Sequence, residues 1–93
     1  MVIDVQKVKE RKKLRLEILT QLYNLHYFAV TQNNNLHGKT SELFGERNSE
    51  KHLAYHYLLT AGYIEIESIE DNSAITLTAK GIDYVEDFYE KKE

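Results

Sequence analysis

Apolar residues recur three or four positions apart from residue 11 to residue 28, the spacing that places them on one face of an α-helix. Val5 and Val8 continue this spacing upstream, and the carboxylate of Asp4 can cap a helix that begins there. The pattern therefore predicts one long helix that begins at Arg11 or as early as Asp4. Its apolar stripe consists of Leu14, Ile18, Leu22 and Leu25, widened by Leu16, Leu19, Tyr23 and Phe28.

A polar run over residues 31–35 ends this helix, because asparagine side chains compete for backbone hydrogen bonds and tolerate turn conformations. A loop is expected from there through about Lys39. Thr40 or Ser41 can then cap a helix of barely two turns, which Gly45 would close with a left-handed residue.

A longer helix is predicted from Glu50 to Ala61, capped by Asn48 or Ser49 and closed by Gly62. Its first turn carries an acidic residue, which the helix dipole favours. Two helices joined by a segment as short as residues 45–48 have the spacing of a helix-turn-helix.

After residue 62 the apolar period changes to two, which is typical of half-buried strands. Apolar and polar residues alternate over residues 64–67 and again over residues 75–78, and the turn formers of residues 70–73 lie between them. This is a predicted hairpin. Thr78 can cap a last helix that ends in a solvated tail, residues 90–93. The apolar stripe of that helix is Ile82, Val85, Phe88 and Tyr89.

A chain of 93 residues with 42% hydrophobic and 29% charged content predicts one small domain, with its core in about residues 11–89. The absence of cysteine excludes disulfides, thiolate zinc sites and thiol nucleophiles. Charged residues interrupt the start MVIDVQKVKE, so neither a secretory signal nor a membrane anchor is expected. The expected location is the cytoplasm. The sequence also carries no glycine-rich phosphate loop, no nucleophile elbow and no carboxylate pair in an evident cleft, so no enzyme and no cofactor are predicted.

The run YLLTAGYIEIE, followed by AITLTAKGIDYVEDF, resembles the end of winged helix-turn-helix domains found in bacterial and phage regulators. Small uncharacterised winged-helix proteins of low-GC Gram-positive bacteria look most similar. The resemblance covers roughly residues 12–89 and implies an α+β fold: a three-helix helix-turn-helix core, a two-stranded wing hairpin and a C-terminal helix.

In that family the helix at residues 50–61 would enter the major groove of double-stranded DNA through its exposed early positions. Ala54, Leu58 and Ala61 share the inward side of a helical wheel. The resemblance therefore implies a DNA-binding transcriptional regulator with a set of contact residues on the outward side and in the preceding turn. Contacts to phosphates or base edges are expected from Ser49, Lys51, His52 and His56, and contacts that position the domain on the DNA backbone from Lys39, Thr40 and Arg47.

The distribution of charge favours a rival class. The net charge is +3 over residues 1–20, 0 over residues 21–60 and −6 over residues 61–93. The predicted recognition helix has one lysine, no arginine and an acidic first turn, and the hairpin would present carboxylates to DNA. The alternative is a protein-interaction module that binds a basic partner, or a DNA mimic. Its contact residues would be Glu65, Glu67, Glu70 and Asp71.

Three further patterns leave alternatives open. His52 and His56 lie one helical turn apart, a spacing that can bind a metal ion, and His26 or His37 could supply a third ligand. A zinc protease has a glutamate directly after the first histidine, where this chain has Leu53. The pair is therefore interpreted as polar surface, and no metal is predicted.

The basic cluster of helix one is interpreted as a solvated face, or as a surface that steers nucleic acid, an acidic partner or the acidic half of this chain. It consists of Arg11, Lys12, Lys13 and Arg15.

The aromatic residues of the first and last helices fit either the core or a homodimer through these terminal helices. They are Tyr23, Tyr27, Phe28, Tyr84, Phe88 and Tyr89.

Overall fold

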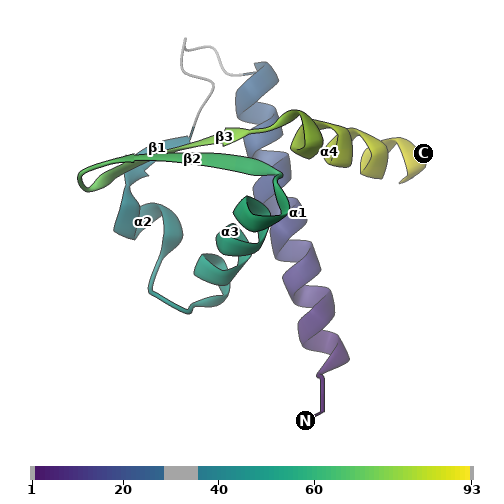
Figure 1. Ribbon diagram of the computed structural model, residues 1–93. Coiled ribbons are helices and arrows are strands. Elements are labelled where there is room, and N and C mark those ends of the chain that lie inside the picture. The colour runs from purple at the N-terminus through teal and green to yellow at the C-terminus, as the bar shows by residue number, and fades with distance from the viewer. Residues whose placement is uncertain (1, 29–35, 93) are drawn as a thin grey trace.

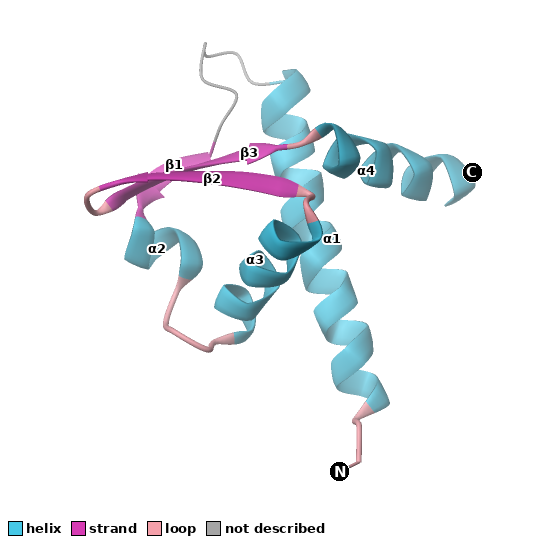
Figure 2. Cartoon of the chain, viewed as in Figure 1, coloured by secondary structure: helices cyan, strands magenta, loops and turns pink. Residues whose placement is uncertain are grey.

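Four helices and a small three-stranded antiparallel sheet make up the computed structural model, which describes residues 2–28 and 36–92 (Figures 1 and 2). This is a mixed α+β arrangement, as predicted. The elements are α1 (Val5–Phe28), β1 (Leu36–Lys39), α2 (Thr40–Phe44), α3 (Glu50–Ala61), β2 (Ile64–Ile69), β3 (Asn72–Leu77) and α4 (Ala79–Lys92).

Polar caps fix the ends of the longer helices. Oδ1 of Asp4 accepts hydrogen bonds from the backbone N–H groups of residues 6 and 7, at 2.9 and 3.3 Å, so the earlier of the two predicted starts of α1 is confirmed. Ser49 caps α3 by accepting from the N–H of His52 at 3.2 Å. Gly62 closes α3 at φ 87°, a left-handed conformation that glycine adopts without steric cost.

The start of α2 differs from the prediction. Lys39 occupies the N-cap position and makes no side-chain cap hydrogen bond, so neither Thr40 nor Ser41 caps this helix. The hydroxyl of Thr40 lies instead 2.7 Å from that of Ser73 on β3. Residues 36–39 were expected in a loop and form β1 instead, because they pair with β3 in the order β1-β3-β2.

The predicted hairpin is confirmed as β2 and β3, joined by a two-residue turn at Glu70 and Asp71. Its tip is connected to the start of α2. The N–H of Thr40 donates to the carbonyl of Asp71 at 2.8 Å, and the buried Ser73 hydroxyl lies between those of Thr40 and Ser68, at 2.7 and 2.9 Å. The hairpin and α2 are therefore held together by hydrogen bonds as well as by packing.

The core lies where α1 passes behind α3 and the sheet (Figure 1). Each layer contributes apolar side chains, and the ring of Tyr55 packs edge-on against that of Phe44 at 5.0 Å, which joins α3 to α2. The buried apolar residues are Ile18, Leu19 and Leu22 of α1, Ala54, Tyr55 and Leu58 of α3, Ile64, Ile75 and Leu77 of the sheet and Val85 of α4.

Two segments project from this core. The first turns of α1 extend beyond α3, and the second half of α4 extends away from the core on the side that lies opposite the tip of the hairpin (Figure 1).

Thr78 caps α4 as predicted, since its hydroxyl accepts from the N–H of Gly81 at 3.2 Å. The helix continues to Lys92, so the tail predicted at residues 90–93 is wrong for residues 90–92, which are helical, and residue 93 lies outside the described residues. None of the helices described combines the length and the apolar character that crossing a membrane requires.

Candidate nucleic-acid interface

Helix α3 has one inward and one outward face. Ala54, Tyr55 and Leu58 are buried against α1, α2 and the sheet, and this agrees with the inward side predicted for Ala54 and Leu58. Most of the remaining helix surface is open to solvent. The exposed residues are Glu50, Lys51, Leu53, His56, Tyr57, Leu59 and Thr60.

The predicted contact residues fall into two groups. Lys39, Arg47, Lys51 and His56 are exposed, and the first three lie at the start of α2, in the turn and at the start of α3. The other three are half-buried and engaged within the protein. They are Thr40, Ser49 and His52.

The half-buried residues shape the turn between α2 and α3. Nδ1 of His52 accepts from the N–H of Asn48 at 3.4 Å, and Asn48 itself is left-handed at φ 66°. The Ser49 hydroxyl caps the helix one residue later. Ser49 therefore caps α3, one of the two caps that the sequence predicts, whereas the contact of His52 with the turn was not predicted.

Lys51 lies on the α2 side of α3. Its ammonium donates to the backbone carbonyl of Glu42 at 3.4 Å, and its alkyl stem passes beside Gly45, the residue that ends α2. The positive charge thus lies near the last carbonyls of α2, where the helix dipole favours it, and remains exposed. Lys51 therefore links α3 to α2 by one exposed hydrogen bond and keeps a cation at the turn.

The opposite edge of α3 is covered by α1. The guanidinium of Arg11 donates to both carboxylate oxygens of Glu50, at 2.9 and 3.0 Å, and that of Arg15 lies 4.0 Å from the ring centroid of Tyr57. The hydrogen bond from Arg11 holds the pKa of Glu50 below its ordinary value. The carboxylate at the start of α3 therefore carries a paired charge.

These contacts divide the basic cluster predicted on the first helix. Arg11 and Arg15 face α3, whereas Lys12 and Lys13 line a groove on the side of α4. Sequence reasoning missed the pairs with α3 because their partners are about 40 positions away, as the separation of 39 between Arg11 and Glu50 shows. No sequence periodicity signals a contact of that range.

The acidic residues of the hairpin are all exposed: Glu65, Glu67, Glu70 and Asp71. Alternation places the first two of them on the outward face of β2 together with Ile69, whose side chain is 77% exposed. Within the described residues no basic side chain pairs with any of the four carboxylates. The hairpin thus presents an uncompensated negative surface.

The two histidines of α3 differ in environment, since His52 is half-buried with Nδ1 engaged and His56 is exposed. His26 packs against the ring of Tyr27 on α1, and the side chain of His37 lies outside the described residues. In the described part of the chain, no three histidine, aspartate or glutamate side chains are grouped so that they could hold a metal ion.

No family model, curated protein or solved structure matches this chain.

Proposed function

We propose that this chain is a winged-helix DNA-binding protein, a small transcriptional regulator in which α3 lies in the major groove. The observation that carries the proposal is the outward face of α3, which stays exposed while α1, α2 and the sheet cover its other sides. A helix that follows a second helix after a short turn, and leaves one face open, has the geometry that fits a major groove.

The charges around the turn support phosphate contacts at the beginning of α3. Lys39, Arg47 and Lys51 are exposed there, and the pairing with Arg11 neutralises the carboxylate of Glu50 that would otherwise oppose them. Phosphates are bound by such cations without regard to sequence. These residues therefore position the domain on the DNA backbone.

Side chains further along the outward face have the chemistry of base contacts. His56 is exposed and can donate a hydrogen bond to a base edge, and Leu53, which is 44% exposed, can contact a thymine methyl group. The hairpin stays away from phosphates in this arrangement because of its carboxylates. Sequence preference would come from α3 alone.

The test is binding of a short duplex, followed by fluorescence anisotropy over a series of salt concentrations and by amide shifts of the labelled protein. We expect shifts over residues 47–56, and we expect Arg47→Glu with Lys51→Glu to weaken binding at least about tenfold and to lower the salt slope by about 2. Lys91→Glu reverses one exposed lysine of α4, against two charges in the double variant, and is the control for a general effect of charge. Equal losses in both variants, or no binding at low salt, contradict the proposal.

A second candidate function is favoured by the position of β2. The sheet order places β2 at an edge, and its outward face carries Glu65, Glu67 and exposed Ile69. An extended basic segment of a partner protein can pair with such an edge and place its cations opposite these carboxylates. A DNA mimic would use the same surface.

Reversing Glu67 and Asp71 to lysine distinguishes the two functions, because the change has opposite effects on the two ligands. It removes the repulsion between the hairpin and DNA phosphates, and it removes the attraction between the hairpin and a basic partner. A DNA-binding protein gains affinity for the duplex, and the neutral pair Glu67→Gln with Asp71→Asn gains less. If the hairpin is the binding surface, the wild type binds a lysine-rich extended peptide and the reversed variant does not. A wild type without affinity for that peptide rejects the second candidate.

A further inference from the structure

A pocket of about 140 Å³ lies where α1, the second half of α3 and α4 converge. Leu19 and Leu58, each 1% exposed, give it an apolar base. None of its lining residues is acidic, so the pocket carries a positive charge that nothing within it balances. The other lining residues are cationic or aromatic: Lys12, Arg15, Tyr57, Tyr63 and Tyr84.

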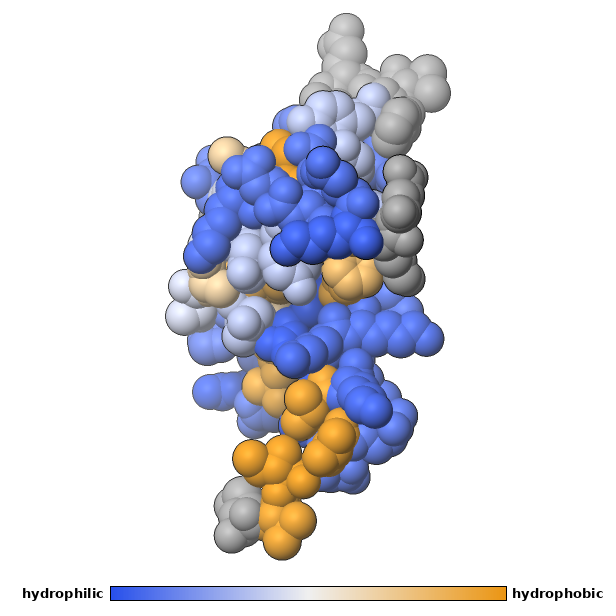
Figure 3. Space-filling model, turned by 90° about the vertical axis from the view of Figure 1, so that its right-hand side faces the viewer, coloured by the Kyte–Doolittle hydropathy of each residue, from blue (hydrophilic) through white to orange (hydrophobic). Residues whose placement is uncertain are grey.

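This pocket is distinct from the exposed apolar end of α1. Val2, Ile3 and Val5 are 96%, 73% and 66% exposed, and Figure 3 shows hydrophobic residues gathered at this end of the molecule. Lys12 lies about 10 Å further along the helix than Val5. The pocket therefore differs from that end in position as well as in charge.

Arg15 is half-buried and has no carboxylate partner within the described residues. Its Nε donates to the backbone carbonyl of Arg11 at 3.3 Å, and its guanidinium lies 4.0 Å from the ring centroid of Tyr57. Stacking of this kind leaves the N–H groups of the terminal nitrogens free to donate to an anion. Lys12, also a lining residue, is exposed and makes no ion pair in the same part of the chain.

Neutral donors surround the same pocket. Within residues 2–28 and 36–92 the hydroxyls of Tyr57, Tyr63 and Tyr84 make no hydrogen bond, whereas that of Tyr23 donates to Glu86 at 2.8 Å. The rings of Tyr63 and Tyr84 pack against each other with their centroids 5.1 Å apart, which joins α4 to the segment after α3. An anion in the pocket can therefore accept hydrogen bonds from hydroxyls as well as from cations.

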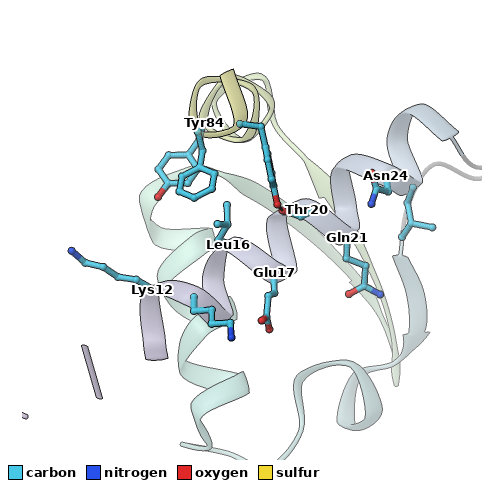
Figure 4. Close-up of a pocket in the computed structure, with 11 residues that line it drawn as sticks. Lys12, Leu16, Glu17, Thr20, Gln21, Asn24 and Tyr84 are labelled. Atoms are coloured by element: carbon cyan, nitrogen blue, oxygen red, sulfur yellow. Dashed lines mark hydrogen bonds between the residues drawn. The ribbon is translucent and has the colours of Figure 1, made fainter. Parts of the chain in front are cut away.

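The pocket adjoins a larger open groove of about 1070 Å³ between α1 and α4, because Lys12 and Tyr84 line both. Figure 4 shows Lys12 and Tyr84 toward one end of this groove, and the carboxylate of Glu17 pointing away from α4. Phe88 and Tyr89 add aromatic surface to the α4 side. A flat apolar group can lie against these rings while an anion attached to it occupies the pocket.

We propose that the pocket binds the phosphate group of a small aromatic phosphate monoester, whose ring lies in the adjoining groove. A phosphate monoester has about −1.5 to −2 charges at pH 7 and three acceptor oxygens. Lys12, Arg15 and the tyrosine hydroxyls match this group better than they match a carboxylate, which has a single charge. A cavity of about 150 Å³ holds a benzene ring, so a phosphate group fits the volume of the pocket. This inference does not depend on what α3 binds.

The first experiment titrates phenyl phosphate into the labelled full chain and follows the amide shifts. We expect saturable shifts over residues 12–15, 57–63 and 80–84, with a Kd below about 1 mM. Benzoate, which has one charge, and inorganic phosphate, which has no ring, are each expected to bind at least about fivefold more weakly.

Three outcomes of that titration overturn the proposal. The first is the absence of saturable shifts up to about 10 mM phenyl phosphate, or saturable shifts confined to other residues. The second is benzoate that binds as tightly as phenyl phosphate, which contradicts the choice of a phosphate. The third is inorganic phosphate that binds as tightly, which contradicts the placement of the ring in the groove.

Substitutions test the pocket itself. Lys12→Gln and Arg15→Gln each remove one cation and are expected to weaken phenyl phosphate binding at least about tenfold. Tyr84→Phe keeps the ring and removes the hydroxyl, so a loss of about fivefold is expected. The matched control is Lys9→Gln, which removes the same charge from an exposed position of α1 outside the pocket. Equal losses in Lys9→Gln and Lys12→Gln show a general effect of charge and overturn the assignment.

Circular dichroism of each variant separates lost binding from unfolding, and Lys12→Gln changes only an exposed side chain. A short DNA duplex then tests the source of the phosphate. A phosphate of DNA is linked on both sides and has one charge, so excess duplex is expected to leave the affinity for phenyl phosphate unchanged. Displacement by the duplex assigns the pocket to the DNA backbone and overturns the proposal.

Discussion

Arg11 and Glu50 join α1 to the first turn of α3 through two parallel hydrogen bonds, Nε to Oε2 at 2.9 Å and Nη2 to Oε1 at 3.0 Å. This bidentate geometry fixes orientation as well as charge. It places an acidic residue at the start of α3 without leaving an unpaired negative charge there. The proposed DNA contact depends on that neutralisation.

The first prediction concerns the pKa of Glu50. The hydrogen bond from Arg11, and then its charge, favour the ionised form and hold this pKa below the ordinary value of 4.5. Because the folded-state pKa is lowered, the pair contributes stability above about pH 4.5 and loses it as the pH falls through the lower pKa. Arg11→Ala is expected to raise the pKa of Glu50 toward 4.5, as followed by NMR of the side-chain carboxyl.

Lys12→Ala provides the control, since Lys12 is exposed on the next position of α1 and makes no ion pair within the described residues. The pKa of Glu50 should be nearly unchanged in this variant. The same value in wild type and Arg11→Ala would show that the bidentate pair does not persist in solution.

The second prediction compares two isoleucines of the same hairpin. Ile75 on the central strand is fully buried, whereas Ile69 at the end of β2 is 77% exposed. Ile75→Ala is expected to lower the free energy of unfolding by about 3 kcal/mol, and Ile69→Ala by less than about 0.5 kcal/mol. Urea denaturation measures both, and similar losses would contradict the register that turns Ile75 inward.

The third prediction concerns Gly81, where α4 passes close to the segment between α3 and β2 and to the end of β3. A Cβ there would collide with the backbone carbonyl oxygen of Tyr63 and lie 2.6 Å from Cδ1 of Leu77. Gly81→Ala is therefore expected to lower the free energy of unfolding by about 2 kcal/mol or more, because backbone must move to admit the methyl group.

Gly62→Ala is the comparison for that variant. Gly62 is left-handed, but the nearest atom to an added Cβ is the Cδ of Lys80 at 4.0 Å, so its expected cost is the conformational one of about 1 kcal/mol. Thermal unfolding of both variants ranks them. A Gly81→Ala protein as stable as wild type would show that α4 lies further from Tyr63.

Local patterns in the sequence were sufficient for the helices and the hairpin, because capping and apolar periodicity act over a few residues. Ser49, Gly62 and Thr78 each perform the role that their position predicted. The strand β1 was missed because the four residues LHGK carry no alternation, and their extended form comes from pairing with β3. A partner strand 33 to 39 positions away leaves no local sign.

The candidate site was less predictable for a related reason. A helical wheel separates inward from outward positions, but it does not show what a side chain bonds to. The wheel gave no sign that Nδ1 of His52 accepts from the backbone N–H of Asn48, or that Arg11 pairs with the carboxylate of Glu50. Each of these contacts is with the backbone or with a distant helix. The expected contacts of Ser49 and His52 with DNA stay predictions.

The hydrogen bonds of Thr40 with Asp71 and Ser73 have a consequence for recognition. They attach the tip of the hairpin to the start of α2, so they limit movement of the hairpin relative to the α2–α3 pair. The angle between them is set during folding, and little conformational entropy is lost when a ligand arrives. A partner of this protein must accept that angle, and selectivity for shape is then present before any individual side chain makes contact.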